Sequence, residues 1–205
     1  MSVFRKPRQA RARITFDKLL DAASLLLGEV GIERISSNLI CERAGVTPPA
    51  FYRYFDDKYA ILAALAERLM ERQNVVLEQW TERMRCLPPE QIAGHTIELI
   101  RDTALVGDGE PGIRWILGAL RAVPRLTPIR LESHAAVTQL LLDLYQPALP
   151  HVPEDVLRRR IRMSVEFGYM LDEMIREEAV DREQVWLDAD HVFTAMATYP
   201  DYAPA

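Results

Sequence analysis

Apolar residues recur every three to four positions along most of this 205-residue chain, which is the period of an α-helix. The clearest stretch runs from Phe16 to Val30, where apolar side chains form one continuous stripe along a helix. Sustained alternation of apolar and polar residues, the pattern of a half-buried β-strand, is nearly absent. The sequence therefore predicts an all-α fold.

Glycine and serine residues mark the ends of the first two predicted helices. Gly31 is expected to end the first helix, because glycine readily takes the left-handed conformation that closes a helix. A short second helix is expected over Ser37–Ala44. Either Ser36 or Ser37 can cap it by accepting a backbone N–H, and Gly45 is placed to close it.

Threonine, proline and aspartate mark the next two helices. Thr47 can cap a third helix that begins at Pro48, where a missing N–H costs nothing, and extends to about Tyr54. Asp57 is expected to cap a long fourth helix that reaches about Cys86 and joins two parts of the molecule. Pro88 and Pro89 should end it. Further helices are expected at about 90–106, 111–122, 127–148, 153–178 and 183–198, with a frayed tail from residue 199, which gives about nine helices in all.

Charge is divided unevenly along the chain. Residues 1–58 contain 10 Lys and Arg against 7 Asp and Glu, whereas the remaining residues contain 15 against 23. This asymmetry suggests a basic end that meets a polyanion and an acidic body that does not. On charge alone, a solvated basic tail without function is an equally good interpretation.

Composition excludes several classes of protein. Two cysteines without a CxxC motif argue against a disulfide scaffold or a zinc module, and we expect neither a metal nor a cofactor. Histidine, serine and carboxylate residues lack the spacing of a catalytic triad, so an enzyme is not expected. Aliphatic runs are too short to span a membrane, and acidic residues interrupt any signal peptide. We therefore expect a cytoplasmic protein.

The two short helices joined by a glycine turn predict a helix-turn-helix, the alternative being an ordinary helical corner. Phe51 and Phe55 are four residues apart and should face the core together. The opposite face then carries residues suited to phosphate and base contacts. Its members are Thr47, Pro48, Pro49, Ala50, Tyr52, Arg53 and Tyr54, with Lys58 one turn beyond.

The stretch from Ile14 to Leu65 resembles the DNA-binding domain of TetR-type transcriptional regulators. The resemblance rests on the segment LLDAASLLLGEVGIERISSNLICERAGVTPPAFYRYFDDKYAILAAL, above all on AGVTPPAFYRYFDDK. Cys41 stands where the family usually has Ala, and Ala50 stands where Ser or Thr is frequent. The second departure removes one side-chain donor from the recognition helix.

The resemblance implies roles for individual residues. Tyr52 and Lys58 should contact phosphates, and Ser37 and Asn38 should touch the DNA backbone or bases. The residues expected in or beside the major groove are Thr47, Pro48, Pro49, Ala50 and Arg53. A basic N-terminal arm, Arg5 to Arg13, should lie along the duplex or in its minor groove.

The resemblance also implies two domains: a DNA-binding domain at residues 1–58 and an effector-binding and dimerisation domain at 59–205. The helix expected at 153–178 has apolar rows on two sides, so it is either fully buried or shares one side with a partner. A monomer core is therefore the alternative to a homodimer interface. The residues expected in that interface are Met163, Phe167, Met170, Met174, Val192, Phe193 and Met196.

Aromatic, soft and ionisable residues on the middle helices are candidates for an effector cavity, although each taken singly fits a plain core or surface role. They are Met84, His95, Trp115, Glu132, His134, Val137, Glu166 and Met170. Such a cavity should favour a largely apolar molecule.

The leading hypothesis is a homodimeric repressor that binds a pseudo-palindromic operator in double-stranded DNA and is released by a small molecule. The alternatives are a structural, nucleoid-type DNA binder without an effector and, from another class, a helical small-molecule enzyme.

Overall fold

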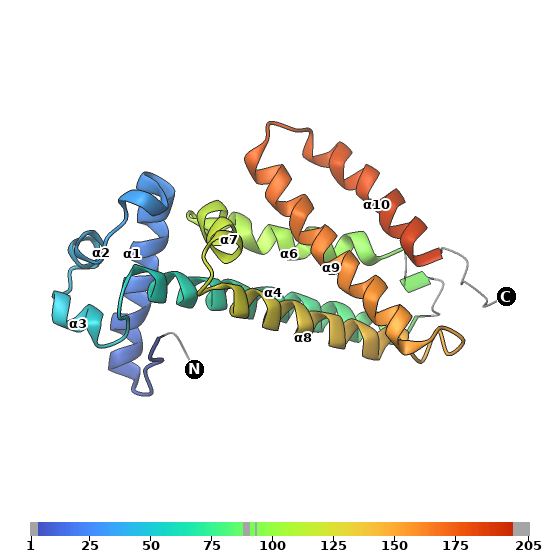
Figure 1. Ribbon diagram of the computed structural model, residues 1–205, viewed down its shortest axis with the longest axis horizontal. Coiled ribbons are helices and arrows are strands. Elements are labelled where there is room, and N and C mark those ends of the chain that lie inside the picture. Colours follow the sequence, from blue (N-terminus) through green and yellow to red (C-terminus); the bar gives the residue numbers. More distant parts are fainter. Residues whose placement is uncertain (1–3, 88–90, 93, 199–205) are drawn as a thin grey trace. The chain divides into compact units, whose positions relative to one another are not determined.

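The computed structural model describes residues 4–87, 91–92 and 94–198, without the side chains of 194–198. Within this part of the chain nine α-helices form, which confirms the predicted all-α fold (Figure 1). The helices are α1 (Ala10–Arg34), α2 (Ser37–Ala44), α3 (Pro48–Tyr52), α4 (Lys58–Met84), α6 (Thr96–Asp108), α7 (Ile113–Ala122), α8 (Thr127–Tyr145), α9 (Glu154–Glu177) and α10 (Arg182–Thr198).

Most helix ends lie within a few residues of their predicted positions. Helix α2 has the predicted bounds, whereas α3 ends two residues early, at Tyr52. Gly31 takes a positive φ of 75°, and α1 kinks there and continues for one turn to Arg34. The prolines expected to end α4, the start of a helix at residue 90 and the frayed tail from residue 199 lie outside the described residues.

Side chains just before α2 and α4 provide two of the caps that the sequence predicts. The hydroxyl oxygen of Ser36 accepts the backbone N–H of Leu39 at 3.3 Å. The Oδ1 atom of Asp57 accepts the N–H groups of Tyr59 and Ala60, each at 2.9 Å. Both caps satisfy N–H groups that a helix start otherwise leaves unpaired.

The chain divides into two compact units. The first, called here the head unit, comprises residues 1–71 and 107–130, and the second, the body unit, comprises residues 72–106 and 131–205. The predicted functional boundary between residues 58 and 59 stays a prediction.

An aromatic cluster forms the core of the head unit. The rings of Phe16 and Phe55 stack with centroids 5.1 Å apart, and Phe51 lies 5.3 Å from Phe55. Phe4 pairs with Phe55 in an isolated antiparallel bridge and is itself buried. Helix α2 packs directly against α1, and α3 against α2, so that the two short helices rest on this core (Figure 1).

Glycine allows α1 and α7 to approach closely within the head unit. A Cβ atom at Gly31 would lie 2.9 Å from a ring carbon of Trp115. A Cβ at Gly112 would lie 2.8 Å from the Cβ of Leu27. Real side chains do not approach that closely, so glycine is required at both positions for α7 to pack against α1 as it does.

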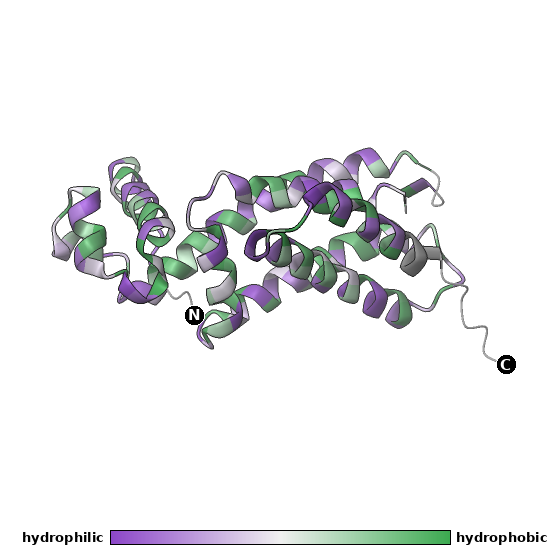
Figure 2. Ribbon diagram, turned by 90° about the horizontal axis from the view of Figure 1, so that it is seen from above, coloured by the Kyte–Doolittle hydropathy of each residue, from purple (hydrophilic) through white to green (hydrophobic). Residues whose placement is uncertain are grey.

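The body unit has two apolar clusters. One surrounds the fully buried Trp80 of α4 and includes residues of α6, α8 and α9. The other surrounds Trp186 of α10 and includes Leu171 and Ile175 of α9. Each helix shows both hydrophilic and hydrophobic residues along its length (Figure 2), as expected of amphipathic helices that bury one face.

Candidate functional site

The turn between α2 and α3 is built around Gly45. This residue takes a left-handed conformation, with φ 64°, and its N–H donates to carbonyls of the last turn of α2. Thr47, two residues later, immediately precedes α3, whose first residue is Pro48. The Thr47 side chain does not make the capping hydrogen bond that was predicted for it. The tight turn therefore has the local geometry of a helix-turn-helix.

The face of α3 opposite the core is exposed. Phe51 and Phe55 are both 0% exposed, which confirms their predicted place in the core. Tyr52, by contrast, is 49% exposed. The other exposed residues of the predicted DNA-binding set are Asn38, Thr47, Pro48, Pro49 and Arg53, while Ser37, Ala50 and Lys58 are half-buried.

A hydroxyl pair joins the exposed ends of the two short helices. The Oγ atom of Ser37 on α2 lies 3.1 Å from the phenolic oxygen of Tyr52 on α3. Either hydroxyl can donate, so one of them always retains a proton for another acceptor. The pair connects the exposed Tyr52 side chain to the start of α2.

Tyr54 corrects one predicted contact. It was expected on the exposed face, but it is only 5% exposed and packs edge-on against Phe16 with centroids 5.6 Å apart. Its hydroxyl donates to the carbonyl of Ala12 at 3.3 Å. The reason is that α3 ends at Tyr52, so helical spacing no longer decides where Tyr54 points.

Lys58 is held in place by the end of α1. Its ammonium donates to the carbonyl oxygen of Ile32 at 3.0 Å and lies 5.7 Å from the centre of the Tyr59 ring. Neither of these two contacts is with an anion. The charge of Lys58 is therefore positioned beside the helix-turn-helix.

The basic arm is partly engaged within the head unit. The N–H of Arg5 donates to the carbonyl of Tyr54 at 3.0 Å, and its guanidinium forms an ion pair with Asp56. Lys6 forms ion pairs with Glu67 and Glu71 at 3.0 and 2.8 Å. The first two cations of the predicted arm are therefore paired with carboxylates of the head unit, and its place on the duplex stays a prediction. Arg8, Arg11 and Arg13 are exposed.

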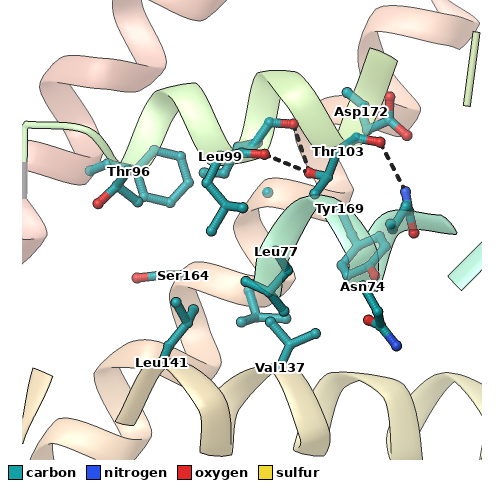
Figure 3. Close-up of a pocket in the computed structure, with 16 residues that line it drawn as sticks. Asn74, Leu77, Thr96, Leu99, Thr103, Val137, Leu141, Ser164, Tyr169 and Asp172 are labelled. Carbon is teal, nitrogen blue, oxygen red and sulfur yellow. Dashed lines mark hydrogen bonds between the residues drawn. The ribbon is translucent and has the colours of Figure 1, made fainter. Parts of the chain in front are cut away.

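A cavity of about 90 Å³ lies in the body unit, lined by residues of α4, α6, α8, α9 and α10. Leu99 and Thr103 of α6 face Val137 and Leu141 of α8 across it (Figure 3). The wall is mostly apolar. Its buried polar side chains include Gln73 of α4 and Asp172 of α9, which are 7% and 5% exposed.

Among the eight residues predicted for an effector cavity, Val137 alone lines this one. Met84 belongs to the apolar cluster around Trp80, and Trp115 lies in the head unit against Gly31. Glu132 is exposed and Met170 is 50% exposed. The structure does not bring these residues together, because residues that share an apolar stripe can still face different neighbours.

Two of the remaining candidates form a polar pair beside the cavity rather than in its wall. His134 is 1% exposed, stacks on the ring of Tyr169 at 4.4 Å, and has its Nδ1 atom 3.2 Å from the carboxylate of Glu166. Partial burial acts to raise the pKa of Glu166, but the hydrogen bond from Arg162 and the charge of His134 lower it on balance. His95 lies at the surface, where its Nδ1 pairs with Glu98 at 2.9 Å.

The residues predicted for the dimer interface fall into two groups. Met163, Met170 and Val192 are 63%, 50% and 43% exposed. Phe193 instead is 2% exposed, packs on Phe167 and lines the cavity, so its predicted place in an interface is corrected to the subunit core. Phe167 and Met174 are half-buried, and the side chain of Met196 lies outside the described residues.

Gln73 and Asp172 were not predicted as site residues. Gln73 lies four residues from both Leu69 and Leu77 on the apolar stripe of α4, and both leucines are buried. A polar residue at such a position must be buried with them, and this is the signal that could have identified it.

Among the described residues, no group of three or more His, Cys, Asp or Glu side chains is placed to hold a metal ion. Nor does any helix in the described ranges have the length and apolarity needed to cross a membrane.

Comparisons with known proteins agree with this geometry. The sequence model for "Bacterial regulatory proteins, tetR family" matches residues 19–65. The class A tetracycline repressor of transposon 1721 from Escherichia coli is 42% identical over 56 residues, 27% of this chain and 26% of that protein. The chain spans less than half the length of the curated relatives that it matches.

Solved structures match over a larger share of the chain. A TetR-family transcriptional regulator from Streptomyces coelicolor is 26% identical with a TM-score of 0.56, covering 89% of this chain and 96% of that one. Another from Rhodococcus sp. is 16% identical with a TM-score of 0.68, covering 88% and 98%. The second likeness shows the fold alone.

A helix-turn-helix on an aromatic core and a helical body unit give the described part of the chain the all-α fold of TetR-type transcriptional regulators. The chain is similar to the TetR family in sequence over residues 19–65 and in fold over most of its length.

Proposed function

We propose that this protein binds a pseudo-palindromic operator in double-stranded DNA as a homodimer, represses transcription there, and is released by a small-molecule effector. The observation that carries the proposal is the exposed α3 face, which stands on the fully buried Phe51 and Phe55. In a helix-turn-helix the second helix enters the major groove, and buried support on its other side holds it in place.

The exposed residues divide by chemistry into two roles. Tyr52 and Lys58 contact phosphates through a hydroxyl and an ammonium, which fix the position of the protein but carry no sequence information. Thr47, Pro48, Pro49, Ala50 and Arg53 lie in or beside the major groove. Arg53 is the candidate for guanine, since a guanidinium matches the two acceptors of that base. Ser37 and Asn38 contact the DNA backbone or bases at the start of α2.

Dimerisation is supported by exposed apolar residues on α9 and α10. Met163 and Met170 are seven residues apart on one face of α9, and both are at least half exposed. When a partner covers large apolar side chains on one helix face, their removal from water lowers the free energy and favours association. A dimer would present two recognition helices to successive major grooves about 34–36 Å apart.

Effector control is supported by the cavity in the body unit, which a purely structural DNA binder does not need.

We propose that the functional boundary lies between residues 58 and 59, with the DNA-binding function before it and effector binding and dimerisation after it. A ligand in the cavity releases DNA only if it prefers the dimer state that does not fit the operator, because equal affinity for both states shifts nothing.

Selection of DNA fragments by the purified protein, followed by footprinting, tests the proposal. We expect one or two discrete protected sites, each with two-fold related half-sites. Broad protection without sequence preference would favour the nucleoid-type alternative, and failure to retain any fragment would overturn DNA binding itself.

A further inference from the structure

The cavity wall in the body unit is mostly apolar, and several of its polar groups have a partner within the protein. The hydroxyl of Thr103 donates to the carbonyls of Leu99 and Ile100, both at 2.9 Å, and that of Ser164 donates to the carbonyl of Arg160 at 3.1 Å. The hydroxyl of Thr96 pairs with Tyr145 at 3.2 Å. Thr103 and Ser164 therefore already donate their hydroxyl protons within the protein.

Gln73 is different. Its Nε2 donates to the carbonyl oxygen of Thr103 at 3.2 Å, while its Oε1 is buried without a hydrogen-bond partner. Since a carbonyl oxygen only accepts, the atom facing Thr103 must be the amide nitrogen, and the unpaired atom is the amide oxygen. A ligand in the cavity could therefore pair this oxygen by donating a hydrogen bond to it.

The charge of the wall is balanced within the protein. Asp172 lines the cavity and forms an ion pair with Arg176, Nε to Oδ1, at 2.9 Å, with both side chains less than 10% exposed. The Arg176 guanidinium also donates to the carbonyl of Ala104 at 2.7 Å. An anionic ligand would meet the Asp172 carboxylate, whose own cation is already engaged, so a charged group is disfavoured in this space.

We propose that the cavity selects an uncharged, largely apolar molecule that carries one hydroxyl or N–H group, which donates to Oε1 of Gln73. This deepens the effector proposal above and rests on it. A cationic ligand is not favoured either, because the carboxylate of Asp172 is already paired with Arg176 and neither Glu132 nor Glu166 lines the cavity. The cavity, about 90 Å³, is smaller than a cavity of about 150 Å³ that holds benzene, so a group held tightly in it is no larger than one small ring.

Phenol and toluene test the donor, because they differ only by a hydroxyl in place of a methyl group of similar size. Both are titrated by calorimetry into the wild-type chain and into Gln73→Met, which keeps the length of the side chain but removes the amide. The ratio of the toluene Kd to the phenol Kd should fall about tenfold in Gln73→Met, since one buried hydrogen bond is lost. Benzoate should bind the wild type at least about tenfold more weakly than phenol.

Ser164→Ala is the matched control, because it removes another polar side chain from the same wall. That variant should keep the wild-type ratio. Circular dichroism verifies that each variant is folded. The comparison of phenol with benzoate uses the wild-type chain only, so it remains a test even if a variant does not fold. If the ratio of the toluene Kd to the phenol Kd is unchanged in Gln73→Met, or if benzoate binds as tightly as phenol, the inference about the ligand is overturned while the effector site itself is not. Binding of none of the three probes would overturn both the inference and the effector site, and would leave DNA binding to be judged by fragment selection.

Discussion

The hydroxyl groups of Ser37 and Tyr52 lie 3.1 Å apart and connect the two helices of the helix-turn-helix at their exposed ends. The Tyr52 ring is half exposed, yet this contact gives its hydroxyl a defined place beside the start of α2. A hydroxyl positioned in this way can donate to a phosphate without first losing much rotational freedom.

Tyr52→Phe should weaken DNA binding at least about tenfold for specific and random sequences alike, because a hydrogen bond from a neutral hydroxyl to a charged phosphate is lost. The salt dependence of binding should stay the same, since no charge is removed. Fluorescence anisotropy with both kinds of duplex at several salt concentrations measures this. A loss confined to the specific duplex would mean that Tyr52 reads bases instead.

Lys58→Ala should weaken binding to all sequences and lower the salt slope by about 1, because one counterion fewer is released. The substitution also removes the hydrogen bond to the Ile32 carbonyl, so urea unfolding of the variant serves as the control for folding. Unchanged affinity together with an unchanged salt slope would contradict the proposed docking of the head unit.

Met170→Glu should give a folded monomer, because a carboxylate at a half-exposed position disturbs a partner more than the subunit. Light scattering at micromolar concentration measures the mass. Val75→Glu, at a similarly exposed apolar residue of α4, is the matched control and should remain dimeric. A wild-type chain that scatters as a monomer would remove the basis of both expectations.

Gly31→Ala should lower the free energy of unfolding by about 1–3 kcal/mol, because the new Cβ meets the Trp115 ring at 2.9 Å and the positive φ of 75° is strained for alanine. Gly118→Ala, in the middle of α7 with nothing within 4 Å of its Cβ, should instead raise it by about 0.5–1 kcal/mol. Urea denaturation compares the two. Equal effects would refute the tight α1–α7 packing.

Stability in acid should depend on Asp57. Burial acts to raise the pKa of this carboxyl, but the Arg125 ion pair at 2.6 Å and the backbone donors of Tyr59 and Ala60 outweigh it and lower the pKa. A lowered folded-state pKa means that the contribution to stability is present above the unfolded value of about 3.9 and is lost as pH falls through the folded-state pKa.

Asp57→Asn should therefore lower the thermal midpoint most at pH 7 and progressively less as the pH falls below about 4, because the wild-type contribution is lost as the carboxyl becomes protonated. Thermal melts followed by circular dichroism across this range measure the difference. Asp56→Asn, whose carboxylate is more exposed, is the control and should have a smaller effect. A difference between Asp57→Asn and wild type that does not change with pH would show that the Arg125 pair contributes nothing.

The local features of this fold follow from residues close together in the chain. Helical spacing predicts the burial of Phe51 and Phe55, and Ser36 and Asp57 cap the helices that follow them. Gly45 takes the left-handed conformation that closes α2. Each of these depends on interactions within about one helical turn, so the sequence is enough to predict them.

Only the tertiary structure decides which helix faces meet. The early end of α3 sends Tyr54 into the aromatic cluster, and packing between α9 and α10 buries Phe193 beside the cavity instead of leaving it for a partner. Gln73 and Asp172 become cavity residues because helices far apart in sequence converge around them. Helical periodicity identifies the apolar face of each helix. Which other helix packs against that face depends on contacts between residues far apart in the sequence, and a local pattern does not encode these contacts.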